Sequence, residues 1–404
     1  MKIQRAGAAS VIHNNRIYML GGVDGKVFLN SVEYAEIKDD GSLTSWKFAT
    51  PLPQERGFFS AIVFQNKIFV VGGANGKYGE NLLRTVFSAK IQSDGSLSQW
   101  MAEKSQLLIP RRCSKLILKD NKLLAIGGFG GALLDTVEAA IFDKQGQLGS
   151  WRMLPNKLTI PRYVNGVSEI SNEALVIAGH HPTKGIGISE VEYANFDDLP
   201  LRWKQSSQLN QGRYAFATTQ VSNVVYVLGG ISGSEYLASV ERLKVEKSVS
   251  ESDWTYTTDL PLVLSNFHAK VINDKIYILG GSTGKQYLNK VWFAEINKSG
   301  DLGFWGSQKQ YSNYTLNKTQ SKSTENLPNS GKVMDVINTE GYTYVQVKQH
   351  NESIWIATTN IEAKIGDKIS FSQGVSMPNF YSKALMREFN VILFVGEAKV
   401  NIPN

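Results

Sequence analysis

The fold is decided by the stretch from Arg56 to Trp100, which contains four short runs that favour β-strands. They read Arg56-Gly-Phe-Phe-Ser-Ala-Ile-Val-Phe64, Lys67-Ile-Phe-Val-Val-Gly-Gly73, Leu83-Arg-Thr-Val-Phe-Ser-Ala-Lys-Ile91 and Asp94-Gly-Ser-Leu-Ser-Gln-Trp100. β-Branched and aromatic residues dominate the runs, and Gly, Asn and Asp separate them. The pattern predicts a four-stranded antiparallel meander with Trp100 in its fourth strand. Such a sheet has two apolar faces and must stack on a partner.

The chain supplies partners by repeating this unit. Two markers recur with one period, since successive tryptophans are 51 to 54 residues apart. The glycine pairs are Gly21-Gly22, Gly72-Gly73, Gly127-Gly128, Gly229-Gly230 and Gly280-Gly281. The period requires one more pair, fourth along the chain, and there the sequence has the degenerate Gly179-His180. The tryptophans are Trp46, Trp100, Trp151, Trp203, Trp254 and Trp305.

This repeat resembles the kelch family of β-propellers. Passages typical of the family are Arg213-Tyr214, Val225-Tyr-Val-Leu-Gly-Gly230 and Lys275-Ile-Tyr-Ile-Leu-Gly-Gly281. The resemblance implies an all-β, six-bladed propeller over residues 1–310. Kelch propellers include binding proteins and a few enzymes, so the fold alone does not decide the function.

Composition narrows the classes of function. The 404 residues are 42% hydrophobic and 20% charged, which is typical of a folded chain. No apolar run reaches the roughly 18 residues of a membrane span, so no membrane insertion is expected. The net charge of +7 is dispersed without a block of five like charges, so nucleic acid is not predicted as a partner.

Catalytic and metal-binding patterns are missing from the sequence. The single cysteine, Cys113, is predicted to be a buried apolar residue in the first strand of the third blade. His180 and His181 are adjacent, but a metal site needs three or four ligands and the chain has five histidines. No nucleophile elbow, phosphate loop or zinc-protease motif occurs. We therefore predict no catalytic residues, no metal and no cofactor.

Two other repeated features are predicted to be structural. An arginine opens five of the six units, at Arg5, Arg56, Arg111, Arg162 and Arg213, and we expect it to brace neighbouring blades rather than to bind a ligand. An Asp-Gly type of turn precedes the leucine and tryptophan of most units. The turn favours a hairpin rather than calcium, and the Leu and Trp should pack between blades.

Positions that break the repeat are the candidates for recognition. The start of strand one and the loop between strands two and three share one face of a meander, and exposed aromatic residues there suit protein binding. The candidate rim residues are Asp24, Lys26, Asn75, Lys77, Tyr78, Phe129, His180, His181, Tyr236, His268, Lys285 and Tyr287.

A polar segment, residues 311–330, is predicted to be a flexible linker because it has almost no apolar residues. Five strand-like runs follow in residues 331–404, and their spacing suggests a small OB-like β-barrel. The domain has seven basic and seven acidic residues, so it lacks the basic groove of a nucleic-acid-binding barrel.

Residues 331–396 resemble a small exported bacterial domain that accompanies periplasmic cytochrome c nitrite reductase. The matching motif includes Met377, Phe380, Ser382, Lys383 and Arg387. The family motif has a second methionine and a histidine where this chain has Val375 and Tyr381. The alternative is that Met377, Phe380, Leu385 and Phe389 only fill the barrel.

These features predict a non-catalytic scaffold that binds another protein in a bacterial envelope or extracellular assembly. The second resemblance implies export and a link to respiratory multihaem enzymes. The first strand begins within a few residues of Met1, so we expect an exported protein without its signal peptide, with a cytoplasmic protein as the alternative. Two other functions remain open, namely glycan binding or modification in the central channel and an adhesin role.

Overall fold

The computed structural model describes most of the chain as β-structure. The described residues are 1–181, 187–198, 200–307, 327–339, 342–349, 352–359, 361–372, 374–382, 385, 387–395 and 398–401. Across these ranges the regular helical structure is one 3-10 turn, η2 (Val249–Glu251), and no helix is long and apolar enough to cross a membrane. Two compact units are present, Met1–Thr255 with Asp259–Phe293, and Tyr256–Thr258 with Ala294–Asn404. The predicted linker falls outside the described residues over 311–326.

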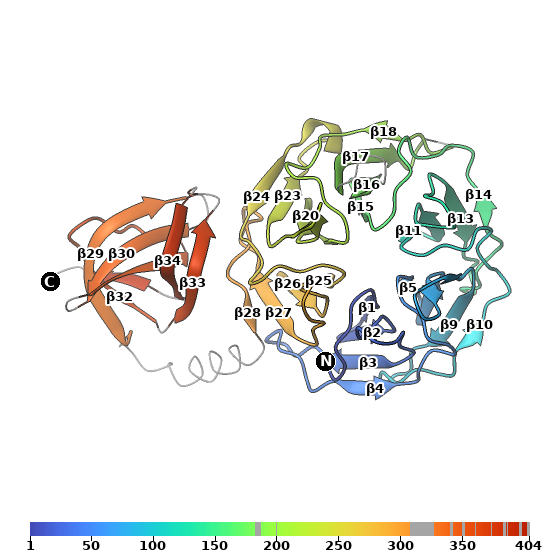
Figure 1. Ribbon diagram of the computed structural model, residues 1–404, viewed down its shortest axis with the longest axis horizontal. Helices are drawn as coiled ribbons and strands as arrows, with labels where there is room; N and C mark the ends of the chain where they lie inside the picture. Colours follow the sequence, from blue (N-terminus) through green and yellow to red (C-terminus); the bar gives the residue numbers. More distant parts are fainter. Residues whose placement is uncertain are drawn as a thin grey trace. The chain divides into compact units, whose positions relative to one another are not determined.

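Six four-stranded antiparallel sheets follow one another along the chain and stand around a common centre (Figure 1). The first three contain β1 (Ala9–His13), β2 (Arg16–Leu20), β3 (Val32–Glu36) and β4 (Lys47–Ala49); β5 (Ser60–Phe64), β6 (Lys67–Val71), β9 (Val86–Lys90) and β10 (Met101–Ala102); β11 (Lys115–Lys119), β12 (Lys122–Ile126), β13 (Val137–Ile141) and β14 (Arg152–Met153). The next three contain β15 (Gly166–Ile170), β16 (Glu173–His180), β17 (Gly187–Asn195) and β18 (Lys204–Gln205); β19 (Ala217–Val221), β20 (Val224–Leu228), β23 (Val240–Lys244) and β24 (Trp254–Thr257); β25 (His268–Ile272), β26 (Lys275–Leu279), β27 (Val291–Glu295) and β28 (Gly306–Ser307).

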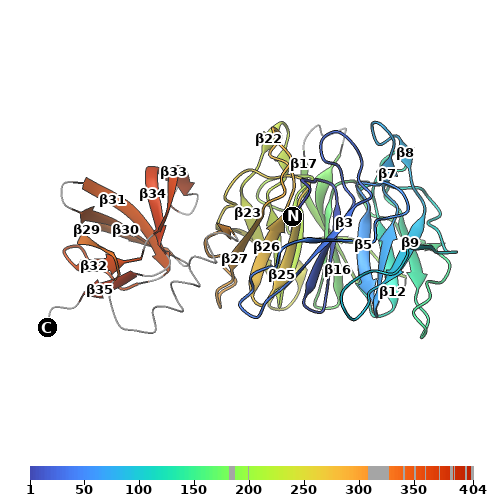
Figure 2. The same ribbon diagram turned by 90° about the horizontal axis from the view of Figure 1, so that it is seen from below.

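The loops between the second and third strands of these sheets project from one face. Two of them form small hairpins, β7 (Ala74–Asn75) with β8 (Asn81–Leu82) and β21 (Ile231–Ser232) with β22 (Glu235–Tyr236). Figure 2 shows β7, β8 and β22 at the same edge. We call this face the loop rim.

The hydrophobic core lies between consecutive sheets. One cluster joins Val11 and Tyr18 of the first sheet to Val70 and Trp100 of the second, and another joins Trp46 of the first sheet to residues of the sixth. The prediction that the repeated Leu and Trp pack between sheets is confirmed. The predicted place of the Trp was wrong in most units, because β10, for example, begins only after Trp100. The Trp side chain fills the space between sheets, and the outermost strand starts after it.

The glycine pairs connect each sheet to the next. The second glycine of a pair donates its N–H to the carbonyl of the residue that opens the following sheet, as from Gly22 to Arg56 at 2.9 Å. At Gly73 the backbone has φ +103°, and a Cβ would lie 2.7 Å from the Cβ of Phe59 and 2.8 Å from the carbonyl oxygen of Gly57. A side chain is therefore excluded at this close approach.

The first and sixth sheets are linked in the same way. Gly281 N–H donates to the Arg5 carbonyl at 2.8 Å, and Arg5 N–H donates to the Leu288 carbonyl at 3.0 Å. The Met1 amino group bonds to the Asn289 carbonyl at 2.9 Å. Each of these two sheets is built from its own four strands. Side-chain packing and backbone hydrogen bonds thus join the ends of the repeat without a shared strand.

The C-terminal region forms one seven-stranded sheet in the order β33-β34-β31-β30-β29-β32-β35. Its strands are β29 (Asn329–Asn338), β30 (Tyr342–Gln349), β31 (Glu352–Thr359), β32 (Lys368–Phe371), β33 (Gly374–Ser382), β34 (Arg387–Val395) and β35 (Ala398–Asn401). The five predicted runs are strands, but the count of five was too low. The sequence of β33 contains Gly374 and Pro378, which disguise a strand, and β35 is short. The OB-like barrel stays a prediction.

Candidate functional site

The repeated arginines are fully buried and bind within the protein. The Arg111 guanidinium pairs with Glu138 at 2.5 Å, and it also donates to the carbonyls of Gly127 at 2.9 Å and Thr136 at 3.3 Å. Equivalent pairs join Arg5 to Glu33, Arg162 to Glu192 and Arg213 to Glu241. The side chain therefore braces the second and third strands of its own sheet, whereas its carbonyl reaches the preceding sheet. The predicted brace between neighbouring sheets is therefore made by the arginine backbone, whereas the side chain acts within one sheet.

Arg56 differs from the other four arginines. Phe87 occupies the position of the paired glutamate, and the Arg56 guanidinium lies 4.8 Å from the centre of the Phe87 ring. Its hydrogen bonds go to the Gly72 carbonyl and the Thr85 hydroxyl, each at 3.1 Å. Desolvation lowers the pKa of Arg56 to about 10. A cation–π contact thus replaces the ion pair here.

An arc of aromatic side chains lies on the loop rim over the third to fifth sheets. Phe129 and Tyr163 have ring centres 6.0 Å apart, and His180 makes edge contacts with Tyr163 at 5.2 Å and with Tyr214 at 4.9 Å. The Arg112 guanidinium lies 5.1 Å from the Phe129 ring centre and donates to the Gly79 carbonyl at 3.1 Å. We call these five residues the aromatic arc.

All five residues of the aromatic arc are half-buried, so part of each side chain faces solvent. Burial lowers the pKa of His180, and the neighbouring His181 lowers it further. The His180 Nδ1 is buried without a hydrogen-bond partner in the described part of the chain. Residues at the matching positions of the sixth, first and second sheets are small, for example Ser265, Ala6 and Gly57. At these matching positions, large side chains are therefore confined to three consecutive sheets.

Phe129 and His180 of this arc were among the rim residues predicted from the sequence. Arg112, Tyr163 and Tyr214 were not. Each of the missed residues directly follows one of the repeated arginines and pairs with the residue after the paired positions. In the fourth sheet that pair is Ala178-Gly179 and not the predicted Gly179-His180, because Gly179 N–H donates to the Arg213 carbonyl as the second glycine does in the other sheets. Comparing that position across the six units would have revealed them, because the other three units have Ala, Gly or Ser there.

Other predicted rim residues lie on the same face but outside the arc. Tyr78 is 78% exposed, and the Lys77 ammonium lies 5.1 Å from its ring centre. Asn75 donates to the Glu55 carbonyl at 3.2 Å. Asp24 accepts from the backbone N–H groups of Lys26 and Val27 at 2.8 and 2.9 Å. Asp24 and Asn75 therefore shape their loops.

On the loop rim, neighbouring loops of the fifth, sixth and first sheets are in contact. Tyr236 lies against Gly284, and Tyr287 lies against Gly25. Lys26 and Lys285 are exposed beside these contacts. His181 is half-buried, and the positions after it, 182–186, lie outside the described residues. These rim residues form the outer part of the same face.

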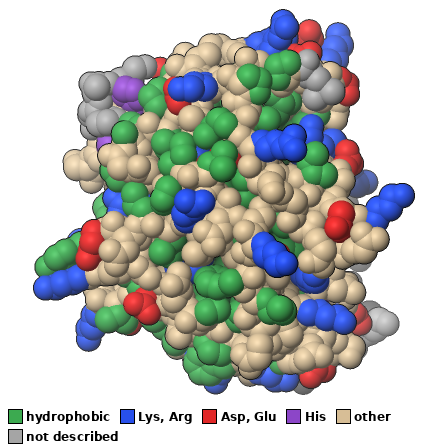
Figure 3. Space-filling view, turned by 90° about the vertical axis from the view of Figure 1, so that its right-hand side faces the viewer, with side chains coloured by type: hydrophobic (Ala, Val, Ile, Leu, Met, Phe, Trp, Pro, Cys, Tyr) green, Lys and Arg blue, Asp and Glu red, His purple; other side chains and the backbone are tan. Residues whose placement is uncertain are grey.

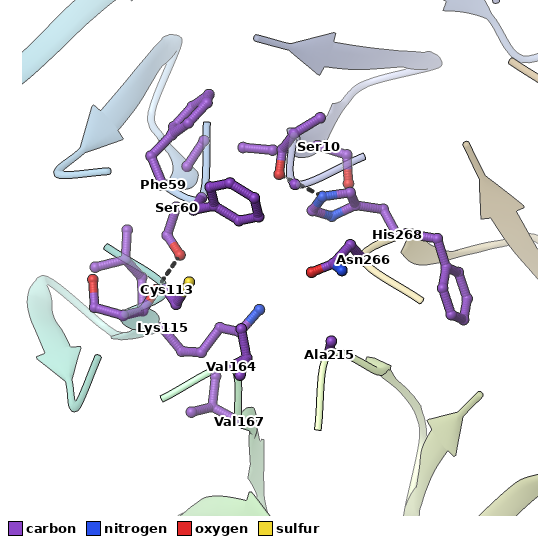
Figure 4. Close-up of a pocket in the computed structure, with 18 of the residues that line it drawn as sticks. Ser10, Phe59, Ser60, Cys113, Lys115, Val164, Val167, Ala215, Asn266 and His268 are labelled. Atoms are coloured by element: carbon purple, nitrogen blue, oxygen red, sulfur yellow. Dashed lines mark hydrogen bonds between the residues drawn. The ribbon is translucent and has the colours of Figure 1, made fainter. Parts of the chain in front are cut away.

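The prediction that His268 belongs to the rim loops was wrong. His268 is the first residue of β25 and lines a central cavity of about 160 Å³ (Figure 4). Its Nε2 lies 2.6 Å from the Ala8 carbonyl, and because a carbonyl only accepts, Nε2 carries the proton. Desolvation lowers the pKa of His268 to about 3. His268 is thus a neutral link between the sixth and first sheets.

The central cavity is lined by the innermost strands and the residues just before them. Its ionisable lining residues are Cys113, Lys115, His268 and Lys270, and no Asp or Glu is among the lining residues. Desolvation raises the pKa of the Cys113 thiol to about 11 and lowers that of Lys270 to about 8. The cavity is therefore cationic. Cys113 is buried, as predicted, but its predicted place in the first strand was wrong, because β11 begins two residues later at Lys115.

The C-terminal motif is divided between an aromatic cluster and undescribed positions. The Phe380 ring contacts Phe394 at 5.0 Å, and Ser382 is buried with its hydroxyl 3.3 Å from that of Tyr344. The Arg387 guanidinium lies 4.6 Å from the Trp355 ring centre. The Met377 side chain and Lys383 fall outside the described residues. The described part of the chain holds no cluster of His, Cys, Asp and Glu that could bind a metal.

Comparison with known proteins supports the kelch-repeat family for this chain. The family model for the Kelch motif matches residues 4–34, 212–261 and 264–292. The chain is 28% identical over 131 residues to Kelch repeat and BTB domain-containing protein 2 of cowpox virus, covering 31% of this chain and 22% of the relative. It is 30% identical over 122 residues to mouse Kelch-like protein 9, covering 30% and 19%.

A longer match is to the spermatocyte protein spe-26 of Caenorhabditis elegans. It is 23% identical over 214 residues, which is 50% of this chain and 34% of the relative. The chain thus spans about a third or less of the length of these relatives. The solved structure of YjhT aligns with a TM-score of 0.60 at 13% identity over 76% of this chain and 98% of that one. This likeness concerns the fold, and the chain is an all-β protein with a kelch-like propeller neighbour.

Proposed function

We propose that this protein is a non-catalytic scaffold whose six sheets form a six-bladed kelch propeller that binds a protein partner through the loop rim. The aromatic arc carries this proposal. Aromatic and arginine side chains on a rigid framework bury much surface with few rotatable bonds, and they dominate the affinity of many interfaces. The kelch-repeat relatives suggest the same protein-binding role.

Two observations favour a protein over other ligands. Four of the five repeated arginines are engaged in buried ion pairs, and the described lining of the cavity has no carboxylates. The described residues there do not supply the cluster of carboxylates, Arg and Tyr that glycan chemistry would need. On the outer face in Figure 3, basic, acidic and apolar side chains are interspersed. That face offers no single-charge stripe for nucleic acid.

The finer part of the proposal concerns the assembly. The likeness of residues 331–396 to an exported respiratory accessory domain supports an envelope or extracellular location and a partner among multihaem enzymes. In this proposal an OB-like C-terminal domain is attached to the propeller through the 311–330 segment. Export, this partner and the barrel topology all depend on that resemblance.

Site-specific crosslinking in the native organism tests the proposal. A photoreactive amino acid at Tyr78 should capture one partner, and the same group at Lys144, an exposed turn residue on the opposite face, should not. The purified pair should then lose at least tenfold in affinity when Tyr163 and Tyr214 are both changed to Ser. The control variant is Phe48→Ser with Met101→Ser, which removes exposed apolar side chains from the outer strands β4 and β10. Equal capture from both faces, or equal losses in both variants, would reject the rim as the binding face.

A further inference from the structure

Lys115 and Lys270 enter the central cavity from opposite sides of the ring. Lys115 is the first residue of β11 in the third sheet, and Lys270 is the third residue of β25 in the sixth. Both line the cavity and are half-buried. Figure 4 shows the Lys115 side chain extending toward the middle, with Asn266 approaching from the other side. These two positions hold Ala, Ser, Gly or an apolar residue in most of the other sheets.

Neither ammonium group has a counter-charge in the part of the chain that the structure describes. The side-chain ammonium groups of both lysines lack a hydrogen bond or ion pair to any described residue, and the lining contains no carboxylate. Desolvation lowers the pKa of Lys270, and repulsion from the positive charge of Lys115 lowers it further. Two like charges that share a protein-lined cavity destabilise each other unless an anion joins them. An anion would therefore stabilise the folded protein.

Two hydroxyl groups without a hydrogen-bond partner among the described residues belong to other residues that line the same cavity. Ser10 and Ser114 are 4% and 2% exposed, both line the cavity, and the hydroxyl oxygens of both lack a hydrogen-bond partner within the described residues. Buried polar atoms are normally satisfied, so these two hydroxyls are available to turn toward acceptor oxygens placed in the cavity. The neighbouring Ser60 hydroxyl is already engaged with the Ser114 carbonyl at 2.7 Å.

The size of the cavity limits the ligand. A volume of about 160 Å³ is close to the ~150 Å³ cavity that accommodates benzene in another protein. A tetrahedral oxyanion is no larger than benzene. It also offers acceptors in several directions, which suits donors arriving from opposite sheets. We propose that the central cavity binds a small doubly charged oxyanion, inorganic phosphate or sulfate, between Lys115 and Lys270 with Ser10 and Ser114 as additional donors.

This site is distinct from the loop rim and does not depend on the protein partner. The oxyanion would join the third and sixth sheets across the ring. Its binding would then stabilise the folded ring by an amount that rises with the logarithm of the anion concentration above the Kd. The ligand therefore acts as a structural anion at the centre of the scaffold.

Calorimetric titration of the full chain with inorganic phosphate, sulfate and acetate at constant ionic strength and pH 7 tests the proposal. Phosphate or sulfate should bind the wild type, and Lys115→Met with Lys270→Met should weaken binding at least tenfold. The matched control is Lys47→Met with Lys90→Met, which removes two exposed lysines of the outer strand β4 and of β9 and should leave the affinity unchanged. The control has the same change in net charge, so it separates a local site from general attraction.

Three results would overturn the assignment. They are the absence of binding of either dianion to the wild type, equal loss in the control variant, and acetate binding as tightly as phosphate. If the double variant does not fold, the single variants Lys115→Gln and Lys270→Gln decide the question, each with an expected loss of at least fivefold. Retained affinity in both folded single variants would exclude a site between these lysines.

Discussion

The backbone N–H of Gly7 donates to the carbonyl oxygen of Asn266 at 3.0 Å, which joins the first sheet to the sixth beside the central cavity. The same contact recurs between consecutive sheets, from Phe58 to Gly7, Cys113 to Phe58, Ala215 to Val164 and Asn266 to Ala215, at 2.6 to 2.9 Å. All of these residues have positive φ, between 47° and 57°. Five hydrogen bonds between left-handed residues therefore border the cavity, and the series is interrupted between the third and fourth sheets.

Replacement of Gly7 by Ala should weaken this series. The backbone at Gly7 has φ +56°, and an added Cβ would lie 2.6 Å from the Phe58 ring. The left-handed conformation costs a residue with a side chain about 1–2 kcal/mol, and a forced displacement of Phe58 adds about 1–3 kcal/mol. We expect the free energy of unfolding, measured with urea, to fall by roughly 2–5 kcal/mol.

Ala215→Gly is the matched control, because Ala215 occupies the same position in the fifth sheet with φ 56°. The change removes the conformational cost of a left-handed residue that has a side chain, which stabilises the fold, and it also removes one buried methyl group, which destabilises it. Because the two effects oppose each other, the free energy of unfolding should change by less than about 1 kcal/mol. If Gly7→Ala is as mild as Ala215→Gly, the close approach between Gly7 and Phe58 does not constrain the ring.

Loss of a buried arginine should be most costly where a carboxylate is left behind. Arg111→Leu leaves Glu138 buried and unpaired, although that carboxylate also accepts from the N–H groups of Leu108 and Ile109 at 2.6 and 3.1 Å. Breaking such a pair costs about 3–5 kcal/mol. Arg56→Leu leaves no buried charge, because Phe87 is its partner, and should cost less than about 2 kcal/mol.

Urea unfolding of the two variants gives the comparison directly. The sixth sheet provides a natural precedent, since Leu264 and Trp292 occupy the positions of the arginine and glutamate there. Equal losses at Arg111 and Arg56 would show that packing of the arginine stems, rather than charge pairing, determines the cost.

The repeat made the framework predictable from the sequence. The close approach of two backbones requires a glycine at Gly73 and its equivalents, and packing between sheets requires a large apolar side chain at Trp100 and its equivalents. Both requirements are local and recur in every unit. The strands of the first six sheets follow from β-branched and aromatic runs for the same reason. In the C-terminal sheet each strand occurs once, so β33 and β35 had no repeat to reveal them.

The sites were less predictable because they depend on comparisons across the ring. Tyr163 and Tyr214 look like ordinary strand residues until their equivalents are seen to be small. Lys115 and Lys270 lie 155 positions apart in sequence and meet only because the third and sixth sheets face one cavity. His268 was misplaced because the sixth unit has no arginine to mark its start. Leu264 occupies the arginine position there, and β25 begins at His268.

Lys270 should make stability depend on pH. Its pKa is lowered from 10.5 to about 8 in the folded protein, so the unfolded chain binds more protons between these values and stability should rise with pH from about 8 toward 10.5. Cys113 and Tyr18 work in the opposite direction, because burial raises the pKa of each. Comparing the wild type with Lys270→Met separates the contribution of Lys270 to the pH dependence of stability from the contributions of Cys113 and Tyr18.

The measurement is the free energy of unfolding of both proteins at pH 7 and pH 9.5, in buffer without phosphate or sulfate. The advantage of Lys270→Met over the wild type should be larger at pH 7, where the buried ammonium is charged, and should shrink at pH 9.5. Phosphate binding to the wild type should weaken over the same range as the lysine loses its proton. A difference between the two proteins that does not vary with pH would show that Lys270 remains charged throughout.

Cys113 should react slowly with alkylating reagents while the protein is folded. The thiolate is the reactive form, and desolvation raises the pKa of the Cys113 thiol from 9.0 to about 11. Iodoacetamide at pH 8 should therefore modify the folded protein at least about tenfold more slowly than the urea-unfolded chain, as followed by intact mass. Cys113 is the single cysteine, so the mass shift reports one site.

The positive charge of Lys115 lowers the pKa of this thiol, so Lys115→Met should slow the reaction further, whereas Lys47→Met should leave it unchanged. Reaction of folded and unfolded protein at the same rate would show that solvent reaches Cys113 freely and that the cavity does not desolvate its lining.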